Sequence, residues 1–389
     1  MSENYDLNSI ASKVTETFTN TTKNVTEHKV DLVSQLFAFS GIISLSLLTI
    51  YVGSTLSAIY RRSLMKSNFK DKQYDIITRK DAALFPFIAS FVLVSFYVVF
   101  KFMNKDDVSK LIRLYFGIFG IYSITKVITP LFEKLLFFIN VRKFNLCLTE
   151  FKDKENKKNY FSHDFNTHFI ITVIFSIVNS AIYIFYTNWI SNNIFAVCFC
   201  INALEFLFIN KFLNGVLLMS GLFFYDIYWV FYTEVMVVVG KSLQVPIKIM
   251  IPQNINFSGN VTGELKHSML GLGDIVIPGL MIAFLCRFDS HHNRKYRPYF
   301  LISFLTYFLG LVAAFLAMVM YKHAQPALLY LVPCGLLTPL FTALARGELK
   351  QLLDYVDKPN DMGNNSNDDS NEHDKVRNDA ILGKSEKVE

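Results

Sequence analysis

Long apolar runs are the feature of this sequence that most restricts its fold. About nine such runs occur, each close to the roughly 20 residues that a helix needs to cross a bilayer. Hydrophobic residues make up 52% of the 389 residues, and they are concentrated in these runs. In hydrocarbon every backbone polar group needs a partner inside its own segment, so we expect an all-α, polytopic membrane protein. The expected spans are Leu36–Ile59, Ala82–Met103, Leu111–Leu131, Phe169–Tyr186, Trp189–Ile209, Gly215–Val239, Met269–Leu285, Tyr299–Met320 and Pro326–Ala345.

Two acidic residues lie inside adjacent apolar runs. Asp226 follows Tyr225 in the sixth run, and Asp274 follows two glycines at the start of the seventh. An Asp near the centre of a spanning helix costs about 2.5–3.5 kcal/mol on insertion scales, so two of them need a reason. The economical reason is that they face each other, because two carboxylates in one low-dielectric pocket cannot both ionise and can share one proton. A pair of this kind has the chemistry of an aspartyl protease.

Small residues and a proline surround the second acid. Gly271 and Gly273 have no Cβ, so we expect them to let the seventh helix approach the sixth. Pro278 lacks the N–H that would bond the carbonyl of Asp274, which predicts a free carbonyl for water or substrate. Ordinary small-residue packing and a simple kink are the alternative.

Three short motifs carry a resemblance to a known family. Tyr225-Asp226, Gly271-Leu272-Gly273-Asp274 and Gln325-Pro326-Ala327-Leu328 resemble, in order and type of helix, those of the intramembrane aspartyl proteases, the presenilin and signal peptide peptidase group. The wider strings around them are most similar to signal peptide peptidase. The resemblance reaches, more weakly, back to the first apolar run and leaves out the amino-terminal segment and the tail. It implies a presenilin-like fold and hydrolysis of peptide bonds within transmembrane segments.

The resemblance also assigns roles to residues. Asp226 and Asp274 would be the catalytic pair, with no metal and no organic cofactor, and the implied substrates are remnant signal peptides and type II membrane proteins. A plain helix start would explain Pro326. We favour a place beside the aspartates, because Pro326, Pro333 and Pro339 would break one helix three times. Tyr225 could donate a hydrogen bond or only pack. The expected supporting residues are Tyr225, Gly271, Leu272, Gly273, Gln325, Pro326, Ala327 and Leu328.

Lysine and arginine are unevenly divided between alternate loops. The loops after the first, third and seventh runs are rich in both, and the others are poor. The positive-inside rule therefore predicts a lumenal amino terminus and a cytosolic carboxyl terminus. The resemblance implies that this multi-pass protein lies in the endoplasmic reticulum membrane. The acceptor sequences at Asn20 and Asn24 would then be glycosylated. The expected division is a lumenal polar segment 1–30, a nine-span protease domain 31–345 and a cytosolic disordered tail 346–389. Within that domain the catalytic helices cover about 215–239 and 269–285, and the helix of the third motif covers 326–345.

The loop between the two catalytic runs alternates at the strand period. Val245–Pro252 is equally compatible with a short edge strand and with an irregular loop at the membrane surface. A helical substrate must unwind before water reaches its backbone, and the unwound segment needs hydrogen-bond partners. We expect it to pair as a strand with Val245–Ile251, the approach to Gly271, or Pro326–Leu328.

Other sequence features exclude some classes of function and leave others open. No His-Glu-x-x-His or cysteine spacing indicates a metal site, and the formal net charge of +6 belongs to loops and not to a nucleic-acid surface. Lys126 and Glu205 lie within spans and could pair, snorkel or face water. The competing functions are a proton or cation transporter or leak pathway, and a non-catalytic membrane scaffold. The lipid bilayer is one expected partner, and the sequence leaves open whether the chain forms a homo-oligomer.

Overall fold

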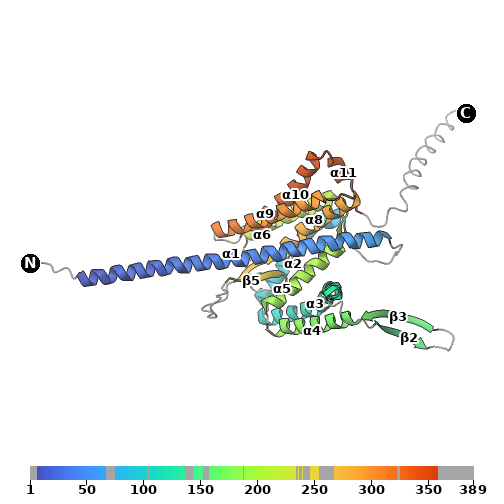
Figure 1. Ribbon diagram of the computed structural model, residues 1–389, viewed down its shortest axis with the longest axis horizontal. Coiled ribbons are helices and arrows are strands. Elements are labelled where there is room, and N and C mark those ends of the chain that lie inside the picture. Colours follow the sequence, from blue (N-terminus) through green and yellow to red (C-terminus); the bar gives the residue numbers. More distant parts are fainter. Residues whose placement is uncertain are drawn as a thin grey trace, which may run out of the picture.

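The computed structural model is a bundle of long helices, with three small sheets among the residues that it describes (Figure 1). It describes residues 7–66, 75–103, 105–135, 143–151, 157–186, 188–233, 235, 239, 246–253, 267–321 and 325–357. The helices are α1 (Leu7–Lys66), α2 (Arg79–Phe102), α3 (Lys105–Leu135), α4 (Thr167–Tyr186), α5 (Trp189–Phe206), α6 (Phe212–Phe231), α8 (Gly273–His291), α9 (Pro298–Tyr321), α10 (Leu328–Ala345) and α11 (Leu349–Asp354). The strands are β1 (Asp75–Ile77), β2 (Lys143–Phe151), β3 (Lys157–Asn166), β4 (Leu207–Ile209), β5 (Lys248–Pro252) and β6 (His267–Gly271).

The helices account for the predicted spans. Within the described residues, eight helices are long and apolar enough to cross a membrane, and the first of these spans is Ser34–Ser63 of α1. α8 takes the place of the remaining predicted span, although it carries Asp274 near its start and Arg287 and Asp289 near its end. The expectation of an all-α polytopic membrane protein is confirmed, with nine as an approximate count.

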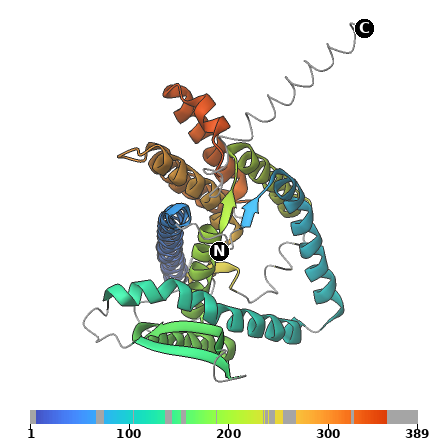
Figure 2. The same ribbon diagram turned by 90° about the vertical axis from the view of Figure 1, so that its right-hand side faces the viewer.

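The helix α8 lies at the centre of the bundle. It packs against α1, α5, α6, α9 and α10, and nearly all of its residues from Ile275 to Asp289 are buried. A helix that is apolar on every side belongs in such a core. Gly279 marks the closest approach, because a Cβ there would come within 2.9 Å of Leu204 Cδ2 and 3.4 Å of Ile50 Cγ1. Figure 2 shows α1 almost end-on beside the other helices.

Three of the predicted span boundaries are wrong. The last residues of the fifth predicted span form β4, which pairs in parallel with β1. The first residues of the seventh predicted span form β6, which pairs antiparallel with β5. The helix α6 ends at Phe231, before the predicted Val239. In the first two cases strand pairing takes up the backbone hydrogen bonds, so the apolar residues leave the helix.

The carboxyl end of the chain also differs from the expected division. At the amino end, the predicted polar segment 1–30 is helical from Leu7 onward, which leaves the division there unchanged. At the other end, α11 and the buried Asp357 lie beyond position 346, where the predicted disordered tail begins. That boundary is wrong, since Asp357 is held by two arginines. Residues 358–389 lie outside the described part of the chain. A further element that the sequence did not predict is the β2–β3 hairpin, which projects from the bundle next to α4 (Figure 1).

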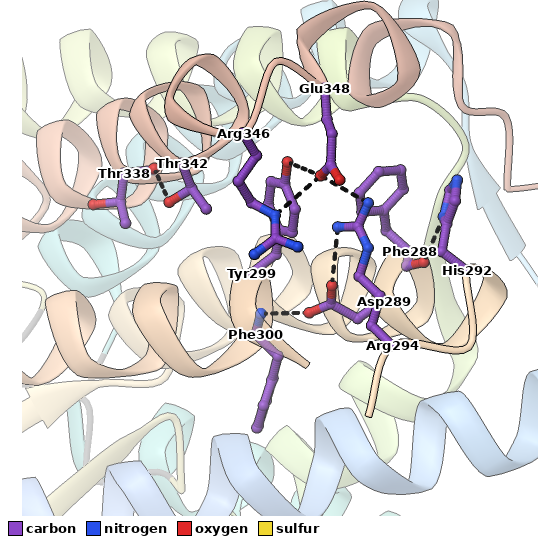
Figure 3. A network of polar contacts seen from close by, with 10 residues as sticks. All are labelled: Phe288, Asp289, His292, Arg294, Tyr299, Phe300, Thr338, Thr342, Arg346 and Glu348. Carbon is purple, nitrogen blue, oxygen red and sulfur yellow. Dashed lines mark hydrogen bonds and ion pairs between the residues drawn. The ribbon is translucent and has the colours of Figure 1, made fainter. Parts of the chain in front are cut away.

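A polar network joins the ends of α8, α9 and α10 that lie far from Asp274 (Figure 3). Glu348 is its centre and accepts hydrogen bonds from Arg294 Nη2 at 2.8 Å, Tyr299 Oη at 2.9 Å and Arg346 Nε at 3.3 Å. Burial raises the pKa of Glu348, but the Tyr299 hydroxyl and the charges of Arg294 and Arg346 outweigh it, so the pKa lies below its ordinary value. Glu348 therefore stays ionised and fixes one end of the bundle.

Candidate active site

The packing of α6 on α8 brings Asp226 and Asp274 together. Asp226 lies near the end of α6 and is buried, and Asp274 is the second residue of α8 and is partly buried. Asp274 lies within electrostatic range of Asp226. The two acids that the sequence analysis singled out therefore share one polar position inside a largely apolar bundle.

Each acid meets the amino-terminal end of a helix. The N–H of Leu328, the first residue of α10, donates to Asp226 Oδ2 at 3.1 Å. Asp274 lies in the first turn of its own helix, with its Oδ2 beside Gly271. Unpaired N–H groups and the helix dipole favour negative charge at these positions. The arrangement therefore supports one negative charge on the pair, while mutual repulsion opposes a second.

The third motif reaches the pair through its backbone. Gln325 and Ala327 are partly buried, Pro326 is buried, and α10 begins only at Leu328. The expectation of three proline breaks in this helix is wrong. Pro326 precedes the helix, and Pro333 and Pro339 lie inside an uninterrupted α10.

The two glycines of the second motif act differently from the expectation. A Cβ at Gly273 would meet nothing within 4 Å, so the approach of α8 to α6 does not depend on a missing side chain there. A Cβ at Gly271 would come within 3.3 Å of Asp274 Oδ2. The absence of a side chain at Gly271 therefore leaves room for the carboxylate of Asp274. The expectation that the two glycines let one helix approach the other is wrong for these positions.

Tyr307 of α9 is a site residue that the sequence analysis missed. It is buried, and its hydroxyl donates to the backbone carbonyl of Asp274 at 3.3 Å. Pro278 cannot bond this carbonyl, because proline has no N–H. The predicted free carbonyl is thus already occupied by a side chain from a third helix. The sequence signal was weak, since Tyr307 is one of 19 tyrosines in an apolar chain.

A two-stranded sheet leads directly into the second motif. β5 and β6 pair antiparallel from Lys248 opposite Gly271 to Pro252 opposite His267, and Leu272 N extends the ladder to Ile247 O at 2.9 Å. Of the two alternatives for this loop, the strand is confirmed over Lys248–Pro252, whereas Val245 lies outside the described residues.

Side chains of α5 cover the outer edge of β5. Asn193 binds both backbone groups of Met250, accepting from its N–H at 2.9 Å and donating to its carbonyl at 2.7 Å. Asn192 donates to the carbonyl of Lys248 at 2.8 Å. These asparagines take the place of a third strand, so this edge of the sheet is closed.

The outer edge of β6 is placed differently. In an antiparallel pair the backbone groups alternate between the partner strand and the opposite edge. The backbone N–H and carbonyl of Met250 point toward Asn193. Those of Met269, which lies opposite Met250, therefore point away from β5, as do those of Gly271 two residues later. This edge therefore presents the backbone of Met269 and Gly271 next to Asp274, with no protein partner for Met269 among the described residues.

An apolar cavity of about 380 Å³ lies on the α3 and α5 side of this sheet. Leu272 of the second motif is one of its walls, together with aromatic residues of both helices. The other residues that line the cavity are Phe116, Phe119, Tyr122, Ser123, Phe199, Asn202, Ala203, Phe206, Pro246 and Ile247.

Tyr225 of the first motif is half-buried, with its ring centroid 6.4 Å from that of Trp229.

Lys126 and Glu205, two charged residues within the spans, pair with each other. Lys126 Nζ lies 2.8 Å from Glu205 Oε2 and 3.3 Å from the ring centroid of Phe206. Of the alternatives left open for these two residues, an ion pair between α3 and α5 is the one observed. Across the described ranges, no group of three His, Cys, Asp or Glu side chains is placed to hold a metal ion.

Comparison with known proteins gives a consistent result. Residues 69–359 match the family model described as signal peptide peptidase. The chain is 38% identical over 320 residues to the mouse protein named signal peptide peptidase, with 82% of each chain covered. It is 37% identical to the human protein of that name, covering 82% of this chain and 83% of the relative. A probable intramembrane protease of Schizosaccharomyces pombe is 33% identical over 82% of this chain and 94% of its own.

Proposed function

Because this chain belongs to the signal peptide peptidase family and is an intramembrane protease, we propose that Asp226 and Asp274 are its catalytic pair. One observation carries the proposal. The two acids come from neighbouring spans and share one position, where the first N–H of α10 holds Asp226. The protein is accordingly an aspartic endopeptidase whose three motifs act together. Family membership gives no support to the transporter alternative.

The chemistry follows from one proton shared by two carboxyl groups. The ionised carboxylate accepts a proton from water as the water oxygen attacks the scissile carbonyl carbon. The protonated partner donates its proton to the carbonyl oxygen, and a second transfer gives a proton to the leaving amine as the C–N bond breaks. The hydrogen bond from Leu328 N–H to Asp226 and the one from the Tyr307 hydroxyl to the Asp274 carbonyl hold both residues in place during these transfers.

The proposed substrates are transmembrane peptides with cytosolic amino termini, such as remnant signal peptides and type II membrane proteins. Purified protein tests the assignment directly. It should cleave a synthetic signal-peptide segment in detergent or bilayers, and a hydroxyl-containing mimic of the tetrahedral intermediate should stop cleavage. Cleavage that resists the mimic but stops with a metal chelator or a serine-directed reagent would refute an aspartic mechanism.

We propose further that the unwound substrate pairs with β6. Three stretches were candidates on the sequence, and two of them have their groups engaged. Asn192 and Asn193 cover the outer edge of β5, and Leu328 N–H is bonded to Asp226. The third candidate is the stretch before Gly271, which forms β6. A strand added to the outer edge of β6 would lie beside Asp274. The apolar cavity that includes Leu272 is the expected place for a substrate side chain.

Tyr307 is proposed as a positioning residue. In Tyr307→Phe the carbonyl of Asp274 loses its donor, which leaves a buried acceptor unpaired at a cost of about 1–3 kcal/mol. We expect kcat to fall about tenfold with little change in KM, because the backbone that carries Asp274 relaxes while the substrate-binding edge stays. Tyr321→Phe, an exposed tyrosine at the end of the same helix, is the matched control. An unchanged kcat in Tyr307→Phe would exclude the role.

The orientation is also a proposal. The asymmetry of Lys and Arg between loops supports a lumenal amino terminus and a cytosolic carboxyl terminus, and membership of the signal peptide peptidase family supports a location in the endoplasmic reticulum membrane. Asn20 and Asn24 lie in the part of α1 whose side chains are outside the described ones. In sealed microsomes, a tag after Glu389 should be digested by added protease, and Asn20→Gln with Asn24→Gln should remove the glycan. A protected tag would reverse both the orientation and the proposed substrate class.

A further inference from the structure

A second polar cavity lies at the opposite end of α8 from Asp274. It measures about 280 Å³, which is several times the roughly 30 Å³ that a water molecule occupies in the liquid. Its walls come from the ends of α1 and α8 and from the turn after α8. The polar residues that line it are Arg61, Arg62, Arg287, Ser290, His291 and Asn293.

Positive charge exceeds negative charge at this cavity. Asp357 bridges two of its arginines, accepting from Arg61 Nε and, at 2.5 Å, from Arg287 Nε. Both of these arginines are almost completely buried, whereas Arg62 is exposed. Of the carboxylates in the described residues, Asp357 alone pairs with these arginines, so one negative charge faces three guanidinium groups. A buried cationic site of this kind is stabilised by an additional anion.

Two residues that line the cavity each have a buried donor atom without a partner in the described part of the chain. Arg287 Nη1 donates to Ser57 Oγ at 2.8 Å, but Arg287 Nη2 has no partner in the described residues although the side chain is fully buried. Ser290 Oγ is likewise buried without a partner there. Buried donors are nearly always paired, so these two atoms indicate a ligand with several acceptor oxygens. The planar guanidinium fork matches a phosphate group best.

The cavity also lies where the span of α1 and the helix α8 both end, and the ends of spanning helices meet the headgroup region. The span of α1 ends at Ser63, so Arg61 and Arg62 belong to its last turn, and Ser290 is the penultimate residue of α8. We propose that this cavity binds a phosphate group, with the headgroup of an anionic phospholipid as its source. In the orientation proposed above, that lipid belongs to the cytosolic leaflet, where anionic lipids are enriched.

Thermal unfolding of the purified full chain tests the site. In nanodiscs of phosphatidylcholine, addition of phosphatidic acid at roughly a hundredfold excess over its Kd should raise Tm by about 5 °C, because the lipid binds the folded state. Inorganic phosphate added to the detergent-solubilised protein, with chloride at equal ionic strength as reference, distinguishes a soluble source. A comparable rise with phosphate would keep the site and make its ligand a soluble anion.

Variants separate a specific site from general surface charge. Arg62→Gln and Ser290→Ala leave the Asp357 bridges intact, and each should weaken binding about tenfold. Lys295→Gln, which removes an exposed cation in the turn after α8 but outside the cavity, should bind as the unaltered protein does. Equal losses in Arg62→Gln and Lys295→Gln would overturn the proposal, as would the absence of any Tm shift with either phosphatidic acid or phosphate.

Discussion

Asp226→Asn and Asp274→Asn should each lower cleavage of a transmembrane peptide by about a thousandfold or more. An amide can neither accept the proton of the attacking water nor return it to the leaving group, so neither acid can replace the other. Folding should survive, because the substitution keeps the shape of the side chain and removes the repulsion within a like-charged pair. Initial rates measured on purified protein give the result.

A matched control is Asp354→Asn, which changes an exposed carboxylate at the end of α11. It should cleave at the rate of the unaltered protein. Thermal unfolding and size-exclusion profiles of the two active-site variants should equal those of the control. Near-normal cleavage in either Asp226→Asn or Asp274→Asn, with folding intact, would remove that residue from the catalytic pair.

Single ester substitutions in the substrate backbone should slow cleavage with a period of two residues. Each ester removes one N–H, and a strand bound to the edge of β6 directs only alternate N–H groups toward Met269 and Gly271. We expect about a tenfold loss at each sensitive position next to the scissile bond, and little loss at the positions between them. A helix-breaking residue near the scissile bond should raise the rate, because less helix must be unwound.

Variants of the protein complete this test. Met269→Pro removes the outward N–H of the proposed edge, so it should slow cleavage strongly, whereas Met269→Leu keeps that N–H and should not. A charge at Ile249, which the sequence alone would have suggested as a test, is unsuitable because Ile249 is completely buried and the charge would disturb folding. Ester effects without the two-residue period would exclude pairing with β6, whatever Met269→Pro does.

Several structural residues were not predictable, because distant parts of the chain bring them together. Tyr307 and Asp274 are 33 residues apart, Asn193 and Met250 are 57 apart, and Arg61 and Asp357 are 296 apart. Each contact depends on how two elements pack. A tyrosine or asparagine in an apolar span has no local signal that names its partner.

The strands show a different limit. Ser268 to Gly271 continue directly into an apolar helix, and a short apolar run of this kind fits a strand and a helix equally well. Ser268–Gly271 forms a strand because it pairs with β5. In the same way, Leu207–Ile209 forms a strand because it pairs with β1. The Val245–Pro252 alternation was the better signal, because a strand produces a two-residue period, although the sequence left an irregular loop equally open.

The sequence by itself determined the fold class and singled out Asp226 and Asp274. Both follow from the bilayer, which requires long apolar helices and makes a carboxylate within them costly without a function. Only the tertiary structure decided what surrounds those acids. The N–H of Leu328 on Asp226, the hydroxyl of Tyr307 on the Asp274 carbonyl and the open edge at Met269 arise where four helices and a sheet meet. The physical reason is that hydropathy is a property of each segment, whereas a hydrogen bond between segments depends on their relative positions.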